Sequence, residues 1–273
     1  MTKKHPLTTA PVLVNEANLS RAWARAALYA IDHSGAEISP LIISVTGFDD
    51  EGKAKEDTLV RTELDKILLA KELRSVSDVA FTIFPQRLWK ISKGDRKKLF
   101  EYYRAAFPRY QAMNRQGNNR GLYFERLTSY GGGPCDGNQL EWILSQYNGR
   151  KQGMRRSMFQ ASIFDPARDH IATAQLQFPC LQHVSFEPTT QGLVVNAFYA
   201  TQQLFVKAYG NYLGLAQLGA FMAHEMGMKL ARLNVVIGIA KFERISKAAD
   251  DLAPLIKACR SCILEEETVA VAA

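Results

Sequence analysis

The sequence contains few cysteines and no long uninterrupted apolar run. Four cysteines among 273 residues do not suggest the disulfide framework of a small secreted protein. No apolar stretch approaches the roughly 20 residues that a membrane-spanning helix needs. The first residues contain only a short apolar patch, broken by Pro6 and Pro11, which does not resemble a signal peptide. These absences predict a cytoplasmic protein with no membrane partner.

The charge pattern is less restrictive. The net charge of +7 suits an anionic ligand such as a nucleotide, but it is equally compatible with a solvated surface. No cluster interleaves basic and aromatic residues, so direct nucleic-acid binding is not predicted. Residues 131–137 are glycine-rich but lack the Lys-Ser/Thr of a phosphate-binding loop. Cys259 and Cys262 form a single C-x-x-C, and no metal site is predicted from it.

The sequence contains no apparent internal repeat or low-complexity linker, so a single α/β domain is expected over residues 1–273, with ample length to bury a core. The first 15 residues are expected to form a loose arm. Strands are expected at residues 40–47, 178–186, 193–201 and 233–240. Helices are expected at residues 20–31, 57–73, 93–113, 138–147, 211–230 and 246–259.

Residues 178–214 organise the rest of the chain. In the first expected strand, Phe178, Cys180, Val184 and Phe186 fall on one face of a period of two, together with a glutamine. A thiol in this position is either buried packing, as free cysteines usually are, or a rigidly held nucleophile. Periodicity alone leaves both interpretations open.

From Pro179 onward the chain resembles the thymidylate synthase family. The Pro179-Cys180 pair matches the family's nucleophile, and without a gap Asn211 matches its pyrimidine-reading asparagine. The common spacing extends to about Arg244. The resemblance implies an α+β fold with a mixed, mostly antiparallel sheet, packed helices and a homodimer formed through the sheet.

The resemblance also implies roles for residues outside this stretch. Tyr123 follows a Gly-x pair, as the family's active-site tyrosine does, although an aromatic strand residue would look the same. Arg155 and Arg156 match an arginine pair that reaches the nucleotide phosphate in the partner's site; alternatively they form a solvated basic turn. Glu63 is the nearest candidate for the family's proton-relay glutamate.

Several positions depart from the family's pattern. Ala200 and Thr201 stand where the family has an Arg-Ser pair that holds phosphate. Gln203 replaces the aspartate that contacts folate, and Lys241 and Glu243 replace a His-x-Tyr triplet that holds the ribose. The resemblance therefore implies a related pocket that has been altered.

The function implied is that of a pyrimidine nucleotide C5-methylase or hydroxymethylase acting on a non-standard, uracil-type nucleotide. Cys180 would add to C6 of the ring as a thiolate, and 5,10-methylenetetrahydrofolate would be the one-carbon donor. Because Ala200 brings no charge, Lys207, Lys241, Arg244 or the arginine pair would have to favour the thiolate. The alternative is a non-catalytic relative that binds nucleotide or serves in an assembly.

Overall fold

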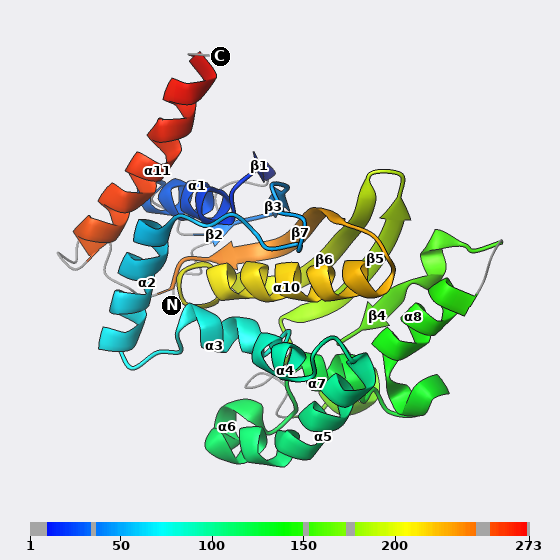
Figure 1. Ribbon diagram of the computed structural model, residues 1–273. Coiled ribbons are helices and arrows are strands. Elements are labelled where there is room, and N and C mark those ends of the chain that lie inside the picture. Colours follow the sequence, from blue (N-terminus) through cyan, green and yellow to red (C-terminus); the bar gives the residue numbers. More distant parts are fainter. Residues whose placement is uncertain (1–9, 34–36, 150–152, 173–177, 244–251, 272–273) are drawn as a thin grey trace.

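The computed structural model describes residues 10–33, 37–149, 153–172, 178–243 and 252–271, and only the backbone of 265–271. Within these ranges the strands form one seven-stranded sheet in the order β1-β3-β7-β6-β5-β4, with β2 also paired to β7 (Figure 1). They are β1 Val12–Glu16, β2 Glu37–Ile38, β3 Leu41–Val45, β4 Gln160–Ser162, β5 Leu181–Thr189, β6 Gly192–Gln203 and β7 Leu230–Lys241.

The sheet is mixed and mostly antiparallel, as the sequence predicted. Antiparallel pairings join β2 and β3 to β7, β4 to β5, and β5 to β6. Parallel pairings join β1 to β3 and β6 to β7. The connection from Gln203, at the end of β6, to Leu230, at the start of β7, contains α10, which returns the chain to the end of the sheet where the parallel neighbour begins.

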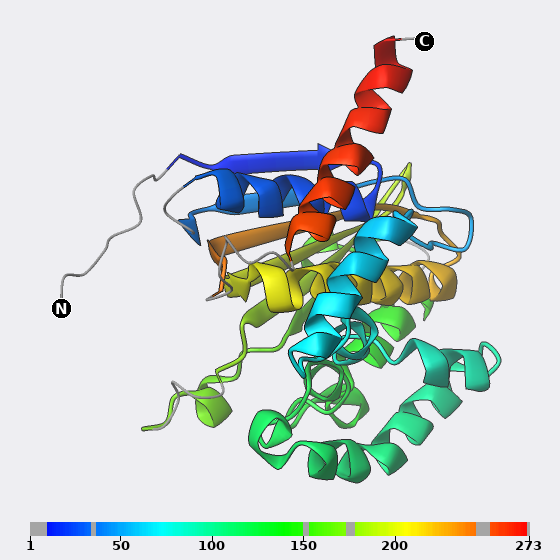
Figure 2. The same ribbon diagram turned by 90° about the vertical axis from the view of Figure 1, so that its left-hand side faces the viewer.

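Helices cover one face of this sheet. They are α1 Leu19–Asp32, α2 Thr58–Ala70, α3 Val76–Phe81, α4 Gln86–Ile91, α5 Arg96–Met113, α6 Arg115–Asn118, α7 Tyr123–Thr128, α8 Gln139–Gly149, α9 Pro166–Asp169, α10 Tyr209–Glu225 and α11 Ala253–Val271. Figure 2 shows the C-terminal helix α11 beside α1 and α2, away from the segment that contains α4 to α8. No helix in the described ranges is long and apolar enough to cross a bilayer.

Helix α10 is the central element of the helical layer, and it is buried on nearly all sides. Its glycines permit this close packing. A Cβ atom at Gly210 would come within 2.6 Å of Val79, and one at Gly214 within 2.7 Å of the Ala80 carbonyl oxygen, both in α3. Side chains at these positions would push α3 away from α10. The close packing holds the first turn of α10 at a defined place beside β6.

Helix α1 packs against the segment that leads into α10. The indole Nε1 of Trp23 donates to the Leu204 carbonyl at 2.8 Å, and its ring lies 5.7 Å from that of Tyr209, centroid to centroid. Ser20, the first residue of the helix expected at residues 20–31, is buried and hydrogen-bonds to the Tyr209 hydroxyl at 2.7 Å. The helix begins one residue earlier, and Asn18 caps it, because its side chain accepts from the Arg21 amide.

No described helix covers the opposite face of the sheet. One row of side chains there, aligned by strand register, is largely apolar: Leu13, Ile42, Val236, Phe198 and His183. The adjacent row is polar, and hydrogen bonds connect Ser44 to Asn234, Asn234 to Asn196, and Asn196 to Ser185. Leu13, Phe198 and Val236 are 67%, 43% and 40% exposed. Such an exposed apolar row is typical of a surface that binds another protein.

One local expectation was wrong for an identifiable reason. Residues 12–16 are not part of a loose arm, because they pair in parallel with β3 and bury Val14. Helix α5 was expected at residues 93–113, and it runs from Arg96 to Met113 with Pro108 inside it. Pro108 and Arg104 are both exposed, so the carbonyl that loses its helical partner faces water. The start of the helix expected at 246–259 and the residue Arg244 lie outside the described residues.

Candidate functional site

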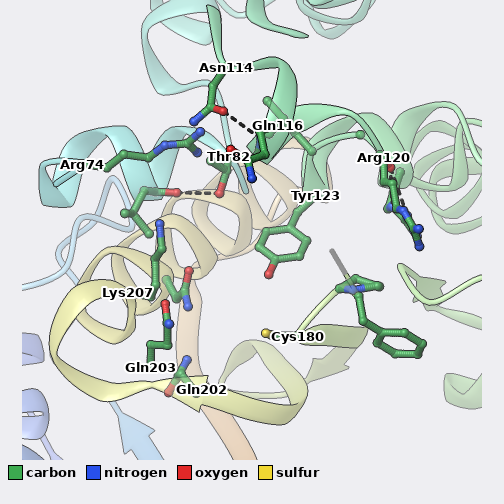
Figure 3. A pocket seen from close by; sticks show the side chains of 18 residues that line it. Arg74, Thr82, Asn114, Gln116, Arg120, Tyr123, Cys180, Gln202, Gln203 and Lys207 are labelled. Atoms are coloured by element: carbon green, nitrogen blue, oxygen red, sulfur yellow. Dashed lines mark hydrogen bonds between the residues drawn. The ribbon is translucent and has the colours of Figure 1, made fainter. Parts of the chain in front are cut away.

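A cavity of about 570 Å³ lies where β5, β6 and the start of α10 meet the segment from α3 to α7 (Figure 3). Four of the residues singled out in the sequence line it: Tyr123, Cys180, Gln203 and Asn211. These residues span nearly ninety positions of the chain, so tertiary folding alone brings them together. The cavity is therefore the candidate functional site.

Cys180 lies directly before β5, and its backbone is held by the neighbouring strand. The Ala200 amide donates to the Cys180 carbonyl at 3.0 Å, and the Thr201 hydroxyl lies 3.7 Å from the thiol sulfur. The expected shared face with Val184 and Phe186 does not form, since a β-bulge shifts the register between Leu181 and His183. The thiol is half-buried and faces the cavity, whereas Val184 and Phe186 are fully buried in the core.

Tyr123 begins α7, so its interpretation as a strand residue is wrong. Figure 3 shows its ring directed towards Cys180. Burial raises the pKa of the Tyr123 phenol, and negative charge on Cys180 raises it further, so the hydroxyl stays protonated. Gly121 permits this arrangement: its φ is +94°, and a Cβ there would lie 2.1 Å from the Glu125 carboxylate. Tyr123 can thus donate a hydrogen bond beside the thiol.

Buried amides line the inner part of the cavity. Asn211 is 5% exposed and, within the described part of the chain, its side chain has no hydrogen-bond partner. Gln202 is 2% exposed; its Oε1 accepts from the Tyr212 hydroxyl at 2.8 Å, while its Nε2 has no partner among described residues. An unpaired buried amide is costly unless a ligand or water completes it. Sequence reasoning missed Gln202, which in isolation is an ordinary strand residue.

Arginine and lysine provide the charge of the cavity, with Arg74, Arg120, Arg126 and Lys207 in its lining. Arg126 is committed to structure: its guanidinium forms a buried ion pair with Asp169 and donates to the Ile163 carbonyl. Among the cations that the sequence suggested near the thiol, Lys207 is the one placed here. Only Lys207 carried any sequence signal, because the arginines come from segments far from Cys180.

Lys207 lies in the π-helical turn Leu204–Ala208 that joins β6 to α10. Burial lowers the pKa of its ammonium group, and the positive charge of Arg74 lowers it further. Glu243 and the Cys180 thiol act in the opposite direction with smaller effect. Lys207 therefore lies close enough to the Cys180 thiol for the charges of the two groups to interact.

Thr201, Lys241 and Glu243 do not line the cavity. Glu243 accepts hydrogen bonds from the Phe205 and Val206 amides, each at 2.9 Å, and so holds the turn before α10. Burial raises the pKa of the Glu243 carboxyl, while these amides oppose the shift. Lys241 is exposed and lies 3.4 Å from a Glu37 carboxylate oxygen. The positions matching the family's ribose contacts thus have structural or surface roles within this chain.

The remaining candidates also lie outside the cavity of their own chain. Glu63 is on α2, where its carboxylate pairs with Lys66 at 2.6 Å. Arg155 is exposed, and Arg156 pairs at 3.0 Å with Glu187 on β5. Register places Glu187 on the uncovered face of the sheet, two residues after Ser185. The arginine pair therefore does not contribute to the cavity of its own chain.

Comparison with known proteins yields no relative: no family model matches the chain, and neither does any curated protein.

Proposed function

We propose that this protein is a pyrimidine nucleotide C5-methylase or hydroxymethylase of the thymidylate synthase type. The observation that carries the proposal is the meeting of Cys180, Tyr123 and Asn211 in one cavity. A thiol, a protonated phenol and an unpaired amide are the groups that covalent catalysis on a uracil ring requires. The substrate would be a uracil-type nucleotide.

Each group has a distinct task in this reaction. The Asn211 amide offers a donor and an acceptor, which match the adjacent N–H and C=O of a uracil ring. The Cys180 sulfur forms a bond to C6, and the electron pair of the C5–C6 double bond moves towards C5 and its neighbouring carbonyl. After C5 has received its substituent and lost its proton, elimination of the Cys180 thiolate restores the double bond. Tyr123 donates a hydrogen bond beside the thiol as charge shifts.

The donor set of the cavity is compatible with a folate. Gln203 is exposed at the cavity wall, and its amide can both donate to and accept from a pterin ring, which the family's aspartate contacts. Bound 5,10-methylenetetrahydrofolate would supply the one-carbon unit and, for a methyl product, also the hydride that reduces it; a hydroxymethyl product would take up water instead.

A specific observation favours the alternative of a non-catalytic nucleotide-binding or assembly protein. Glu63, Lys241 and Glu243 all lie outside the cavity, and no glutamate lines it among the described residues. A proton relay would then depend on water or on Tyr123. A protein that binds nucleotide without turnover would keep the cavity and lose only the chemistry.

A substrate panel distinguishes the two functions. We expect release of tritium from C5-labelled uracil nucleotides with 5,10-methylenetetrahydrofolate, with little or no turnover of deoxyuridine monophosphate. The loss of one charged contact to phosphate, at Ala200, costs roughly 1.5–3 kcal/mol, or one to two decades in affinity. Mass spectrometry identifies a methyl or hydroxymethyl product. Nucleotide binding without tritium release from any substrate would establish the alternative, and efficient conversion of deoxyuridine monophosphate would contradict the altered pocket.

We further propose a homodimer formed through the uncovered sheet face. Phe198 lies within its apolar row, and Arg156 lies beside the same face, from which it could reach the partner's cavity. Replacing Phe198 with Asp is expected to reduce the mass measured by light scattering at micromolar concentration from two chains to one. Leu59→Asp, at an exposed leucine on α2, is the matched control and should leave the mass unchanged. A wild-type mass of one chain would refute the dimer.

A further inference from the structure

The cavity wall carries positive charge that no acidic residue balances. Its lining, in the part of the chain that the structure describes, includes three arginines and one lysine but neither aspartate nor glutamate. Arg126 is already neutralised by Asp169. Arg120 also lines the cavity, and Figure 3 shows it on the far side of Tyr123 from Arg74 and Lys207. On the side of Tyr123 away from Arg120, the unbalanced charge is therefore that of Arg74 and Lys207.

Arg74 is held in place by a buried amide. Its Nη2 donates to Asn118 Oδ1 at 2.9 Å, and Asn118 Nδ2 in turn donates to the Tyr110 carbonyl at 2.7 Å. Asn118 is only 5% exposed, so this support is rigid. Fixing one edge of a guanidinium leaves its other N–H groups in a defined direction. Figure 3 shows the Arg74 side chain reaching into the cavity.

Lys207 approaches the same space from the opposite wall. Within the described ranges its ammonium group has neither an ion pair nor a hydrogen bond. Glu243, whose negative charge favours the charged form of Lys207, already accepts from two backbone amides. Two like charges that face each other in a partly buried site destabilise the free protein. An anion placed between Arg74 and Lys207 would remove this cost and gain charge-assisted hydrogen bonds from both.

We propose that Arg74 and Lys207 form an oxyanion subsite that binds the phosphate of the nucleotide whose ring lies over Cys180. The nucleotide part rests on the proposed function. Arg74, Lys207 and Cys180 line the same cavity, so a group bound between the two cations belongs to the ligand that covers the thiol. Because these cations come from the loop before α3 and the turn before α10, the phosphate lies away from position 200 of β6. The subsite therefore selects a ligand whose phosphate is placed differently from that of deoxyuridine monophosphate.

Calorimetric titration of inorganic pyrophosphate tests the subsite without reference to any reaction. We expect wild-type protein to bind pyrophosphate, and Arg74→Gln or Lys207→Met to weaken the binding about 10- to 100-fold. Lys207→Arg, which keeps the charge, should retain most of it. The matched control is the double variant Arg87→Gln/Lys90→Met, which removes two exposed cations from α4 outside the cavity. Equal affinity in all these proteins, or no binding by wild type at millimolar pyrophosphate, would overturn the proposal.

Paired ligands identify the source of the anion. Uridine monophosphate and uridine differ only in phosphate, and folic acid and pteroic acid differ in the glutamate carboxylates. If Lys207→Met lowers the affinity for uridine monophosphate but not for uridine, the result supports the phosphate assignment. If it lowers only the affinity for folic acid, the result overturns that assignment. If pyrophosphate binding depends on both residues but no uracil nucleotide protects Cys180 from alkylation, the anion subsite stands and the proposed function fails.

Thermal unfolding separates loss of binding from loss of fold. Since burial and Arg74 both disfavour the charged form of Lys207, Lys207→Met is expected to stabilise the free protein near neutral pH. The gain in free energy of unfolding that is typical of removing such a partly buried charge raises the unfolding midpoint by about 2–4 °C. A midpoint well below that of wild type would show that Lys207 supports the fold, and would overturn its assignment to the subsite.

Discussion

Replacing Cys180 with alanine is expected to abolish tritium release from C5-labelled uracil nucleotides while the fold remains intact. Without a group that adds to C6, C5 does not become nucleophilic, so we expect a fall of at least about 10⁴-fold in rate. The thiol is half-buried and faces the cavity, so removal of one sulfur atom leaves little void. The rate is measured as tritium released per enzyme. Undiminished release by Cys180→Ala would contradict the assignment of Cys180 as nucleophile.

The other three cysteines provide internal controls for this experiment. Cys259 and Cys262 are buried in α11, and burial raises the pKa of Cys259 to about 12, so neither should react readily with iodoacetamide. Cys135 is exposed and will be alkylated irrespective of ligand. Cys135→Ala should therefore keep full activity and leave Cys180 as the most readily labelled thiol. Protection of that thiol by a uracil nucleotide would support its place in the site.

Replacing Arg126 with methionine is expected to destabilise the protein by about 3–5 kcal/mol, the cost of leaving a buried charge without its partner. Arg126 and Asp169 form two charge-assisted hydrogen bonds, at 2.7 and 2.8 Å, and both side chains are almost fully buried. Arg126 also donates to the Arg120 carbonyl and so supports the cavity wall beside Tyr123. Urea unfolding gives the free-energy difference. A loss below about 1 kcal/mol would contradict a structural role of this size.

The pH dependence of this loss identifies the responsible carboxylate. Burial alone would raise the pKa of Asp169, but the hydrogen bonds and charge of Arg126 lower it below the usual 3.8. Wild-type stability from this group is thus present above pH 3.8 and is lost as pH falls through the lower folded value. In Arg126→Met, burial is opposed by the Asp165 amide and the charge of Arg168 but no longer by Arg126, so Asp169 takes up a proton at higher pH. The deficit should therefore be smaller at pH 4.5 than at pH 7, and Arg126→Met/Asp169→Leu should recover much of it.

The sheet and its main helices are largely determined by local sequence pattern. Apolar, β-type runs at residues 193–201 and 233–240 predicted strands that the structure extends to β6 and β7. The amphipathic run of residues 57–73 predicted α2, and the structure shows Asp57 as its N-cap, because its side chain accepts from the Val60 amide. Strand β1 could not be predicted in this way, because its five residues are stabilised mainly by pairing with β3.

Individual site residues could be proposed from the sequence only where the spacing of its residues could be compared with the motifs of a known family. Cys180 and Asn211 lie in the same cavity as that spacing requires, and Tyr123 joins them from a helix that was not predicted. Lys241 and Glu243 were assigned to the site by the same comparison, but neither lines the cavity. The turn before α10 needs acceptors for its free amides, and Glu243 satisfies this need instead of facing a ligand.

The sequence by itself determined where the main strands and helices form, since hydrophobic periodicity and capping act over a few residues. Tertiary structure alone decided which charges meet. Arg74 and Lys207 are separated by more than a hundred residues, and no local pattern indicates that α10 would bring the turn carrying Lys207 close to the start of α3. That approach depends on the close packing permitted by Gly210 and Gly214. The electrostatic character of the cavity follows from this packing, because Coulomb interactions depend on distance in space and not along the chain.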